Sequence, residues 1–377
     1  MPKHAFLSAS SSDRWLHCPP SAHLCAQEED LGSPFAQEGT DAHALCQYEL
    51  EKQLGRESKD PKEDLTFYNE EMQEAADGYV AFVMEQLADI RKNCPDPAVF
   101  VEQTLDFSKW VTHGFGTGDC VIVADDLLQI IDFKYGVGVL VSAAGSDGNG
   151  NSQLKCYALG ALDSFGDLYN IRRIRLSIYQ PRRQNIDSYD LSVEELLRWA
   201  DNTLAPIAKL AFAGDGEFSA GDHCVFCKVR ATCRKRAEYN MEITKYDFAP
   251  PPTLTAEEIA EILPKLDQIT SWAEDLKDHA LKEALKGTEY PGWKLVEGRS
   301  SRKITDEAAA AEIIAEAGFE PWEKRLQTIT ALTKQMGRKT FNDLLSGLIE
   351  KPRGKPTLVP ESDQRPAYNT AEQDFRE

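Results

Sequence analysis

The chain has 377 residues, of which 42% are hydrophobic and 28% charged. These values are ordinary for a soluble globular protein of two or three domains, and they exclude a disordered or fibrous chain. No apolar run reaches the length of a membrane span, and residues 1–15 lack the apolar core of a secretion signal. We therefore expect a cytoplasmic protein with no membrane partner.

The net charge, the clusters of basic residues and the cysteine spacing limit which ligands this chain could bind. The net charge of −20 argues against a protein that coats nucleic acid over its whole surface, because phosphate binding depends on lysine and arginine. Basic residues cluster at 172–183 and 228–236, which predicts either a local positive groove or two solvated faces. Nine cysteines, three of them inside residues 224–233, favour a metal site in a reducing compartment over a disulfide framework.

The N-terminal part of the chain alternates helical and β-rich patterns. Apolar residues recur at helical spacing in four segments, which are residues 38–54, 65–93, 153–162 and 193–212. Short β-rich runs lie between turn signals at residues 99–105, 119–125, 127–134 and 174–181. We expect the first three runs to be successive antiparallel strands. The order predicts an α/β domain over residues 1–246, with a mixed central sheet flanked by helices.

The domain organisation changes after this region. The three prolines in DFAPPPTLT cannot continue a helix, so we expect a linker at residues 247–256. Helical spacing then recurs in a long segment and again at residues 305–317 and 327–348. We predict a mainly helical domain over residues 257–350 and a flexible tail over residues 351–377.

The first helix of the second domain has clear end signals. Thr255 and Glu258 form a capping-box pattern at its start. Pro264 should bend the helix, and Gly287 should end it.

Two acidic residues and a lysine lie on neighbouring predicted strands. Asp119 stands in GTGDC, and Asp132 and Lys134 stand in IIDFK. Because side chains alternate across a strand, Asp132 and Lys134 share one face, and hairpin pairing can bring Asp119 beside them. Two carboxylates can hold Mg²⁺ or Mn²⁺, and an ammonium can orient water and stabilise charge on a phosphate. Such a set suits phosphodiester hydrolysis.

The alternative is that these residues are a turn cap and a surface ion pair. A lone DxK sequence favours that interpretation, because it is common by chance. Ile130, Ile131 and Phe133, however, make the strand apolar and central, and a charged pair inside such a strand requires a reason.

Four other side chains are candidates for the same site. Gln153 and Tyr157 lie at i and i+4 of a predicted helix, so they share a face. His43 in EGTDAH can ligate a metal or carry a proton, and Glu102 lies in the strand VFVEQTL. Each of these alone is as readily structural.

A second constellation consists of cysteines. Cys224, Cys227 and Cys233 have a C-x2-C-x5-C spacing that can wrap one metal centre, and Cys18 in HCPPS is the best fourth ligand. Zinc with His17 or His223 is the main alternative, and the spacing alone favours it. The remaining cysteines read as small buried hydrophobic residues, and these are Cys25, Cys46, Cys94, Cys120 and Cys156.

Taken together, these motifs resemble the RecB-like branch of the PD-(D/E)xK nucleases, in which an iron-sulfur cluster joins the ends of the nuclease domain. That family has an early cysteine, a histidine motif, GxxD, (D/E)xK and QxxxY motifs, and a final cysteine triplet. The matching residues, in that order, are Cys18, His43, Asp119, Asp132 with Lys134, Gln153 with Tyr157, and Cys224, Cys227 and Cys233. The resemblance covers about residues 15–237 and favours a 4Fe-4S cluster over zinc.

The resemblance implies a restriction-endonuclease-like core and a role for each residue. Asp119, Asp132 and the main-chain carbonyl of Phe133 would hold the divalent metal, with His43 as an additional ligand. Lys134 would position the attacking water. The QxxxY pair would contact DNA or steady the site, Glu102 is a further catalytic candidate, and the cluster would be structural. The arginines expected to bind DNA are Arg172, Arg173, Arg182 and Arg183.

The whole chain also resembles a phage and prophage family that is catalogued as a domain of unknown function. This resemblance supplies context without a mechanism. Together with the RecB-like motifs, it implies a DNA exonuclease in phage or prophage recombination, repair or processing, in the cytoplasm of a bacterial host. The sequence contains no helicase-type phosphate loop, so a phage recombination or single-strand-binding partner is an option. The alternative is an inactive nucleic-acid-binding or adaptor protein with a structural metal-cysteine site. The sequence leaves the oligomeric state open.

Overall fold

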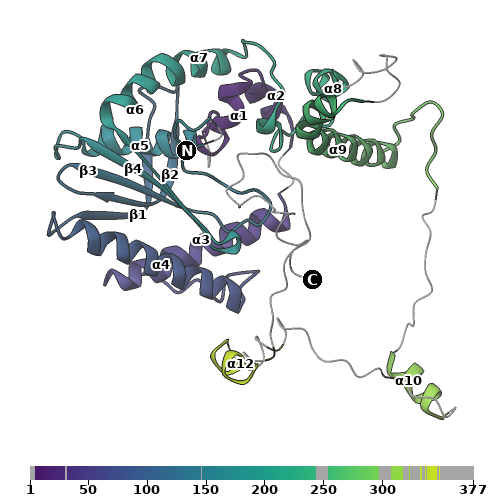
Figure 1. The fold of residues 1–377 in the computed structure, drawn as a ribbon, viewed down its shortest axis with the longest axis horizontal. Helices are drawn as coiled ribbons and strands as arrows, with labels where there is room; N and C mark the ends of the chain where they lie inside the picture. The colour runs from purple at the N-terminus through teal and green to yellow at the C-terminus, as the bar shows by residue number, and fades with distance from the viewer. Residues whose placement is uncertain are drawn as a thin grey trace, which may run out of the picture. The chain divides into compact units, whose positions relative to one another are not determined.

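The computed structural model describes residues 5–29, 32–145, 147–242, 254–296, 307–316 and 338–345, and the single residues 322, 332, 336 and 348 (Figure 1). The chain divides into two compact units, Met1–Leu295 and Val296–Glu377. Within the described residues, no helix is both long enough and apolar enough to cross a membrane.

The first unit is built on a five-stranded mixed sheet in the order β1-β2-β3-β4-β5. The strands are β1 (Ala98–Asp106), β2 (Phe115–Val123), β3 (Leu127–Phe133), β4 (Arg173–Gln180) and β5 (Asn185–Ser192). Neighbours are antiparallel except β3 and β4, which are parallel. The predicted α/β fold is confirmed. Strand β5 was not predicted, because this edge strand (NIDSYDLS) is polar and no residue in it is fully buried.

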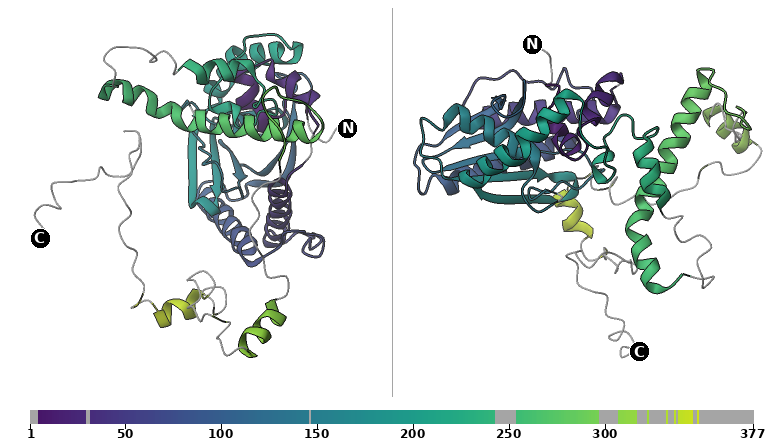
Figure 2. Two further views of the ribbon diagram at one scale, coloured as in Figure 1. Left: turned by 90° about the vertical axis from the view of Figure 1, so that its right-hand side faces the viewer. Right: turned by 90° about the horizontal axis from the view of Figure 1, so that it is seen from above.

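Helices cover both faces of the sheet, so the unit has three layers (Figures 1 and 2). One face carries α3 (Pro34–Gln53) and α4 (Glu70–Ile90). The other face carries α5 (Ser152–Phe165), α6 (Val193–Trp199) and α7 (Ala205–Ala213), with the π-helical segment Ala200–Leu204 joining the last two. The short helices α1 (Ser12–His17) and α2 (Ser21–Gln27) pack beside α7.

The two hydrophobic cores follow from strand alternation. Val121 and Ile130 point toward the α5 side, whereas the next residues along, Ile122 and Ile131, point toward α3 and α4. All four side chains are fully buried. On the α5 side, Gly160 allows close packing, because a Cβ there would lie 3.0 Å from the Leu105 backbone. The central strands are therefore held from both sides, which fixes the polar residues at their ends.

After α7 the chain returns to the N-terminal helices. A loop containing the 3₁₀ turn Asp222–Cys224 leads into α8 (Arg234–Met241), and α9 (Ala256–Leu285) follows. The predicted capping box at Thr255 and Glu258 is present, the helix is continuous through Pro264, and Gly287 has a left-handed φ of 104° just after the helix end. No side chain of α9 is fully buried.

Helix α9 is anchored to the 224–236 segment by one aspartate. The Asp275 carboxylate accepts from Arg230 Nε at 2.8 Å and from Arg236 Nη1 at 2.5 Å. The Arg236 side chain is only 7% exposed. Helix α9 lies in the first unit, whereas the sequence predicts a domain boundary just before this helix.

Replacing Asp275 with alanine is expected to destabilise this region. The change leaves a buried guanidinium unpaired, which costs on the order of 3 kcal/mol. Hydrogen exchange of the α9 amides should accelerate, whereas the same substitution at the exposed Asp278 should leave it unchanged. Equal exchange in both variants would contradict an anchoring role for Asp275.

The second unit contains the helices α10 (Glu307–Glu316) and α12 (Arg338–Leu345), each inside a segment predicted to be helical. Most of the predicted linker at 247–256 and the whole tail at 351–377 lie outside the described residues.

Candidate functional site

Three acidic residues form a row across β1, β2 and β3. The pairing on both sides of Glu102 puts it opposite Asp119. The β2–β3 register, continued by one residue, puts Asp132 opposite Asp119 on the other side. The predicted convergence of Asp119 with the DxK strand therefore agrees with the strand register.

A histidine and two of these carboxylates form a potential metal-binding triad. Atoms of His43, Glu102 and Asp119 that could ligate a metal all lie within 4.8 Å of one another. His43 reaches the sheet from α3, and its Nδ1 lies 3.2 Å from Asp119 Oδ1. The other carboxylate oxygen of Asp119 accepts from the Phe133 backbone N–H at 2.7 Å. That bond fixes the carboxylate between strand and helix. The Phe133 carbonyl remains a predicted ligand.

Asp132 is the centre of a second polar group beside the triad. It is 2% exposed, and its Oδ2 lies 3.0 Å from Lys134 Nζ. Gln153 connects the group: its amide nitrogen donates to Asp132 Oδ1 at 3.2 Å and to Tyr157 Oη at 3.1 Å. Its oxygen accepts from Lys134 Nζ at 3.1 Å. The predicted DxK and QxxxY residues therefore form one network, although Asp132 is not a member of the 4.8 Å triad.

The three residues of the triad shift one another's pKa values. Burial by itself lowers the pKa of His43, but Asp119, with Asp132 and Glu102, outweighs it and raises that pKa to about 9. The imidazole is 35% exposed, so water screens part of this effect. Burial and Asp119 raise the pKa of Glu102 to about 7. Burial opposes ionisation of Asp119, yet His43 and the hydrogen bonds hold its pKa below the usual range.

Asp132 and Lys134, which form an ion pair, both have raised pKa values. Burial raises the pKa of Asp132, and Lys134 offsets only part of this. Burial by itself lowers the pKa of Lys134, but Asp132 and Asp119 outweigh it and raise that pKa. The neighbouring carboxylates therefore favour the charged form of the lysine.

Glu102 has a strained backbone. Its φ is 48°, in the left-handed region that costs a residue with a Cβ about 1–2 kcal/mol. Such strain is concentrated at functional sites, where the surrounding structure enforces it. Here it accompanies a carboxylate directed at His43 and Asp119. The sequence offered no signal of this conformation.

The glycine of the GxxD motif has a steric role. A Cβ at Gly116 would lie 2.7 Å from the Tyr157 ring. We expect Gly116→Ala to displace this ring and loosen the hydrogen bond between Gln153 and Tyr157. A crystal structure of the variant checks this, and an unmoved ring would contradict it.

The predicted DNA-binding arginines lie at opposite ends of β4. Arg172 and Arg173 are at its start, where Arg173 pairs with Leu127 of β3, five residues before Asp132. Arg173 also forms a two-pronged ion pair with Asp126, with Nε 3.0 Å from Oδ2.

The other two arginines follow β4 at its C-terminal end, the end at which the acidic row lies. Arg182 is paired with Glu38 at 3.1 Å and with Glu71 at 3.2 Å. Arg183 donates to the Val137 carbonyl at 3.1 Å. The four arginines therefore do not form one continuous patch, because β4 separates the two pairs and acidic groups neutralise one member of each.

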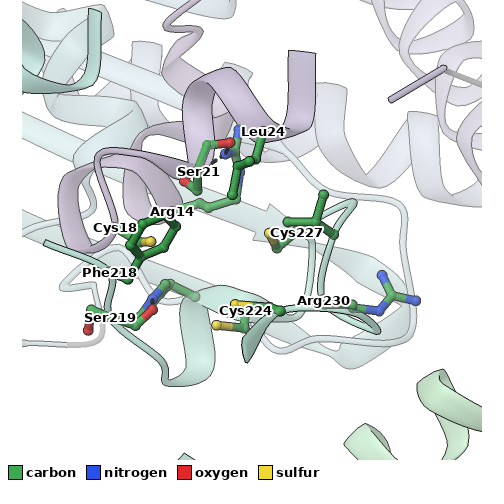
Figure 3. Close-up of a pocket in the computed structure, with 12 residues that line it drawn as sticks. Arg14, Cys18, Ser21, Leu24, Phe218, Ser219, Cys224, Cys227 and Arg230 are labelled. Atoms are coloured by element: carbon green, nitrogen blue, oxygen red, sulfur yellow. Dashed lines mark hydrogen bonds between the residues drawn. The ribbon is translucent and has the colours of Figure 1, made fainter. Parts of the chain in front are cut away.

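The four predicted cysteine ligands line one pocket (Figure 3). Cys18 comes from the end of α1, and Cys224, Cys227 and Cys233 come from the loop before α8. The first three are buried, and Cys233 is half-buried. The pocket thus brings together chain segments that are about 200 residues apart.

The surroundings of the cysteines are basic. Arg14 and Arg230 line the pocket, and Arg14 donates to the Ser21 carbonyl at 2.7 Å. Of the two histidines considered as zinc ligands, His223 lines the pocket and stacks on His17, with 5.1 Å between the ring centroids.

Cys25 makes a contact that its sequence position did not predict. Cys25 is buried, as expected, but its sulfur lies 3.7 Å from Cys227 Sγ. Its pKa is lowered to about 6, chiefly by the contact with Cys227, against the effect of burial. It is therefore more than a hydrophobic filler. The other four cysteines in that group are buried as predicted, and these are Cys46, Cys94, Cys120 and Cys156.

Two comparisons with known proteins bear on this chain. A solved structure described as "Crystal structure of SSO0001" shares 12% sequence identity, covering 59% of this chain and 96% of that chain, with a TM-score of 0.24. This score is too low to argue a shared fold. The family described as "Protein of unknown function (DUF2800)" matches residues 4–366, which is most of the sequence. The chain therefore belongs to the DUF2800 family.

Proposed function

We propose that this chain is a metal-dependent deoxyribonuclease that hydrolyses phosphodiester bonds. The observation that carries the proposal is the triad of His43, Glu102 and Asp119 next to the buried Asp132–Lys134 pair. Acidic ligands, a lysine and a hydrogen-bonded glutamine gathered at one end of the sheet are groups that suit phosphoryl chemistry.

The residues present fit a divalent cation. Buried Oδ2 of Asp132 accepts no hydrogen bond within the described structure, and a buried carboxylate oxygen needs a cationic partner. Lys134 Nζ at 3.0 Å supplies part of that charge. Carboxylate oxygens with one imidazole suit Mg²⁺ or Mn²⁺. His43, Glu102, Asp119 and Asp132 would hold the ion, which when bound offsets charge on the phosphate and lowers the pKa of water.

The chain's own residues account for the remaining requirements. Lys134 directs its ammonium toward the acidic row, where it can orient a water molecule and stabilise an anionic phosphate. Asp132 and Gln153 hold that ammonium at 3.0 and 3.1 Å, which fixes its direction. Tyr157 in turn holds the Gln153 amide at 3.1 Å. The glutamine is therefore a positioning residue in this proposal.

We propose further that the cysteine pocket binds a 4Fe-4S cluster with a structural role. Tetrahedral zinc, with Zn–S distances of about 2.3 Å, requires sulfurs about 3.8 Å apart. Among the described residues, no three cysteines bring their sulfurs within 4.8 Å of one another. The preference for a cluster over zinc therefore rests on the resemblance. Arg14 and Arg230 would offset the negative charge of a thiolate-ligated cluster.

The substrate and context of the proposal come from the resemblance. They are DNA, exonuclease action, and phage or prophage recombination, repair or processing. Arg182 and Arg183 lie at the same end of the sheet as the acidic row and are the better candidates for DNA contacts.

A nuclease assay tests the proposal directly. The purified full chain is incubated with linear single-stranded and double-stranded DNA in Mg²⁺ or Mn²⁺, beside an EDTA control. We expect shortening of DNA only when metal is present. Binding of DNA without cleavage in either metal would instead support the alternative of an inactive nucleic-acid-binding or adaptor protein.

Metal binding should strengthen as the pH rises. His43 and Glu102, with pKa values raised to about 9 and about 7, hold protons that a cation must displace. Their raised values stabilise the metal-free fold at low pH, and this stability is lost as the pH rises through about 7 and then about 9.

Thermal unfolding with EDTA or Mg²⁺ measures this effect. The increase in melting temperature caused by Mg²⁺ should grow between about pH 6 and about pH 9. His43→Gln should flatten the upper part of the curve. An increase that is the same at both ends of the range would contradict the assignment of these ligands.

A further inference from the structure

The structure contains a fifth cysteine at the cysteine pocket. Cys25 lies on α2, one helix after Cys18, and its Sγ is 3.7 Å from Cys227 Sγ. Both side chains are 7% exposed. The backbone N–H of Lys228 donates to Cys25 Sγ at 3.4 Å, which holds the sulfur against the loop.

This contact is specific to one pair. Among the described residues, no other two cysteine sulfurs make such a contact, although four cysteines line the pocket. Cys227 lines the pocket, whereas Cys25 is not among the lining residues. The two sulfurs must approach by about 1.7 Å to reach a disulfide bond of about 2.05 Å.

We propose that Cys25 and Cys227 form a reversible disulfide when the pocket holds no metal centre. The disulfide is itself the proposed modification of these two cysteines. The statement that a bound cluster prevents the disulfide rests on the proposed function, in which Cys227 is a cluster ligand. A disulfide between α2 and the 224–233 loop would join the same two chain segments as the cluster, so it would keep the domain closed when the cluster is lost.

The chemistry balances with a peroxide as the oxidant. One thiolate of the pair attacks hydrogen peroxide, the O–O bond breaks, and a cysteine sulfenic acid and hydroxide form. The second thiolate then attacks the sulfur of the sulfenic acid, the S–S bond forms, and a second hydroxide leaves. The protons of the two thiols convert the hydroxides to water. The two sulfurs together lose two electrons, which reduce one peroxide to two waters.

Peptide mapping of the full chain tests the proposal. The protein is stripped of metal with a chelator under reducing conditions, desalted and treated with one equivalent of hydrogen peroxide. Free thiols are then alkylated before trypsin digestion without reductant. Cys18 and Cys25 fall on one tryptic peptide and Cys224 and Cys227 on another, so tandem mass spectrometry must locate the bond.

The expected result is a Cys25–Cys227 link that disappears after addition of dithiothreitol. The oxidised metal-free protein should melt about 5 °C or more above the reduced metal-free protein. Cys25→Ser should lose both effects, whereas the matched variant Cys94→Ser should retain them. Cys94 is a buried cysteine at the end of α4 that lies outside the pocket.

Two results would overturn the proposal: a link that joins Cys18 to the loop, or full alkylation of Cys25 after oxidation of the wild-type chain. Iron content of a separate anaerobic preparation is measured in parallel. A Cys25–Cys227 link in a chain that never binds iron would sustain the disulfide and defeat only the proposed cluster.

Discussion

Replacing Asp132 with asparagine, or Lys134 with alanine, should reduce DNA cleavage by about a thousandfold or more. Asp132 carries the buried oxygen that accepts no hydrogen bond, and Lys134 supplies the charge next to it. Loss of a metal ligand or of a preorganised charge at a phosphoryl-transfer site costs about 10²–10³ in rate or more. The initial rate of release of labelled nucleotides from linear DNA measures the effect.

Matched variants separate catalysis from folding. Asp126→Asn removes an aspartate from the opposite end of the sheet, and Lys109→Ala removes an exposed lysine that is 3.6 Å from a surface aspartate. Both should cleave at the wild-type rate. All four proteins should show the same circular dichroism spectrum. Wild-type cleavage by folded Asp132→Asn or Lys134→Ala would sink the nuclease assignment.

Replacing Cys18 or Cys233 with serine should remove iron from the protein and destabilise the first unit. The two residues line the pocket from opposite ends of the domain, so loss of either ligand breaks the connection between them. The wild-type protein, purified without oxygen, should hold about four iron atoms per chain and absorb visible light. Metal analysis and thermal unfolding measure the two consequences together.

Cys94→Ser is the control for this series, because Cys94 is buried but does not line the pocket. It should retain the wild-type iron content. One zinc atom per chain in place of iron would contradict the cluster and support the alternative that the cysteine spacing first favoured. An iron-containing Cys18→Ser variant would show that another side chain supplies the fourth ligand.

Some features of the site were predictable because they lie within one element. Asp132 and Lys134 share a strand face by the two-residue period of a strand, and Gln153 and Tyr157 share a helix face by the spacing of i and i+4. The structure joins all four in one hydrogen-bonded network. The capping box before α9 follows local rules in the same way.

The tertiary structure decided what local periodicity does not encode. The strained φ of Glu102 and the reach of His43 from α3 complete the triad, and both depend on packing between distant elements. The contact between Cys25 and Cys227 joins residues 202 positions apart. Spacing along a strand or helix is fixed by the backbone, and it could be read in the sequence. Contacts between elements depend on how the sheet and its helices close around two shared cores, and only the folded chain specifies them.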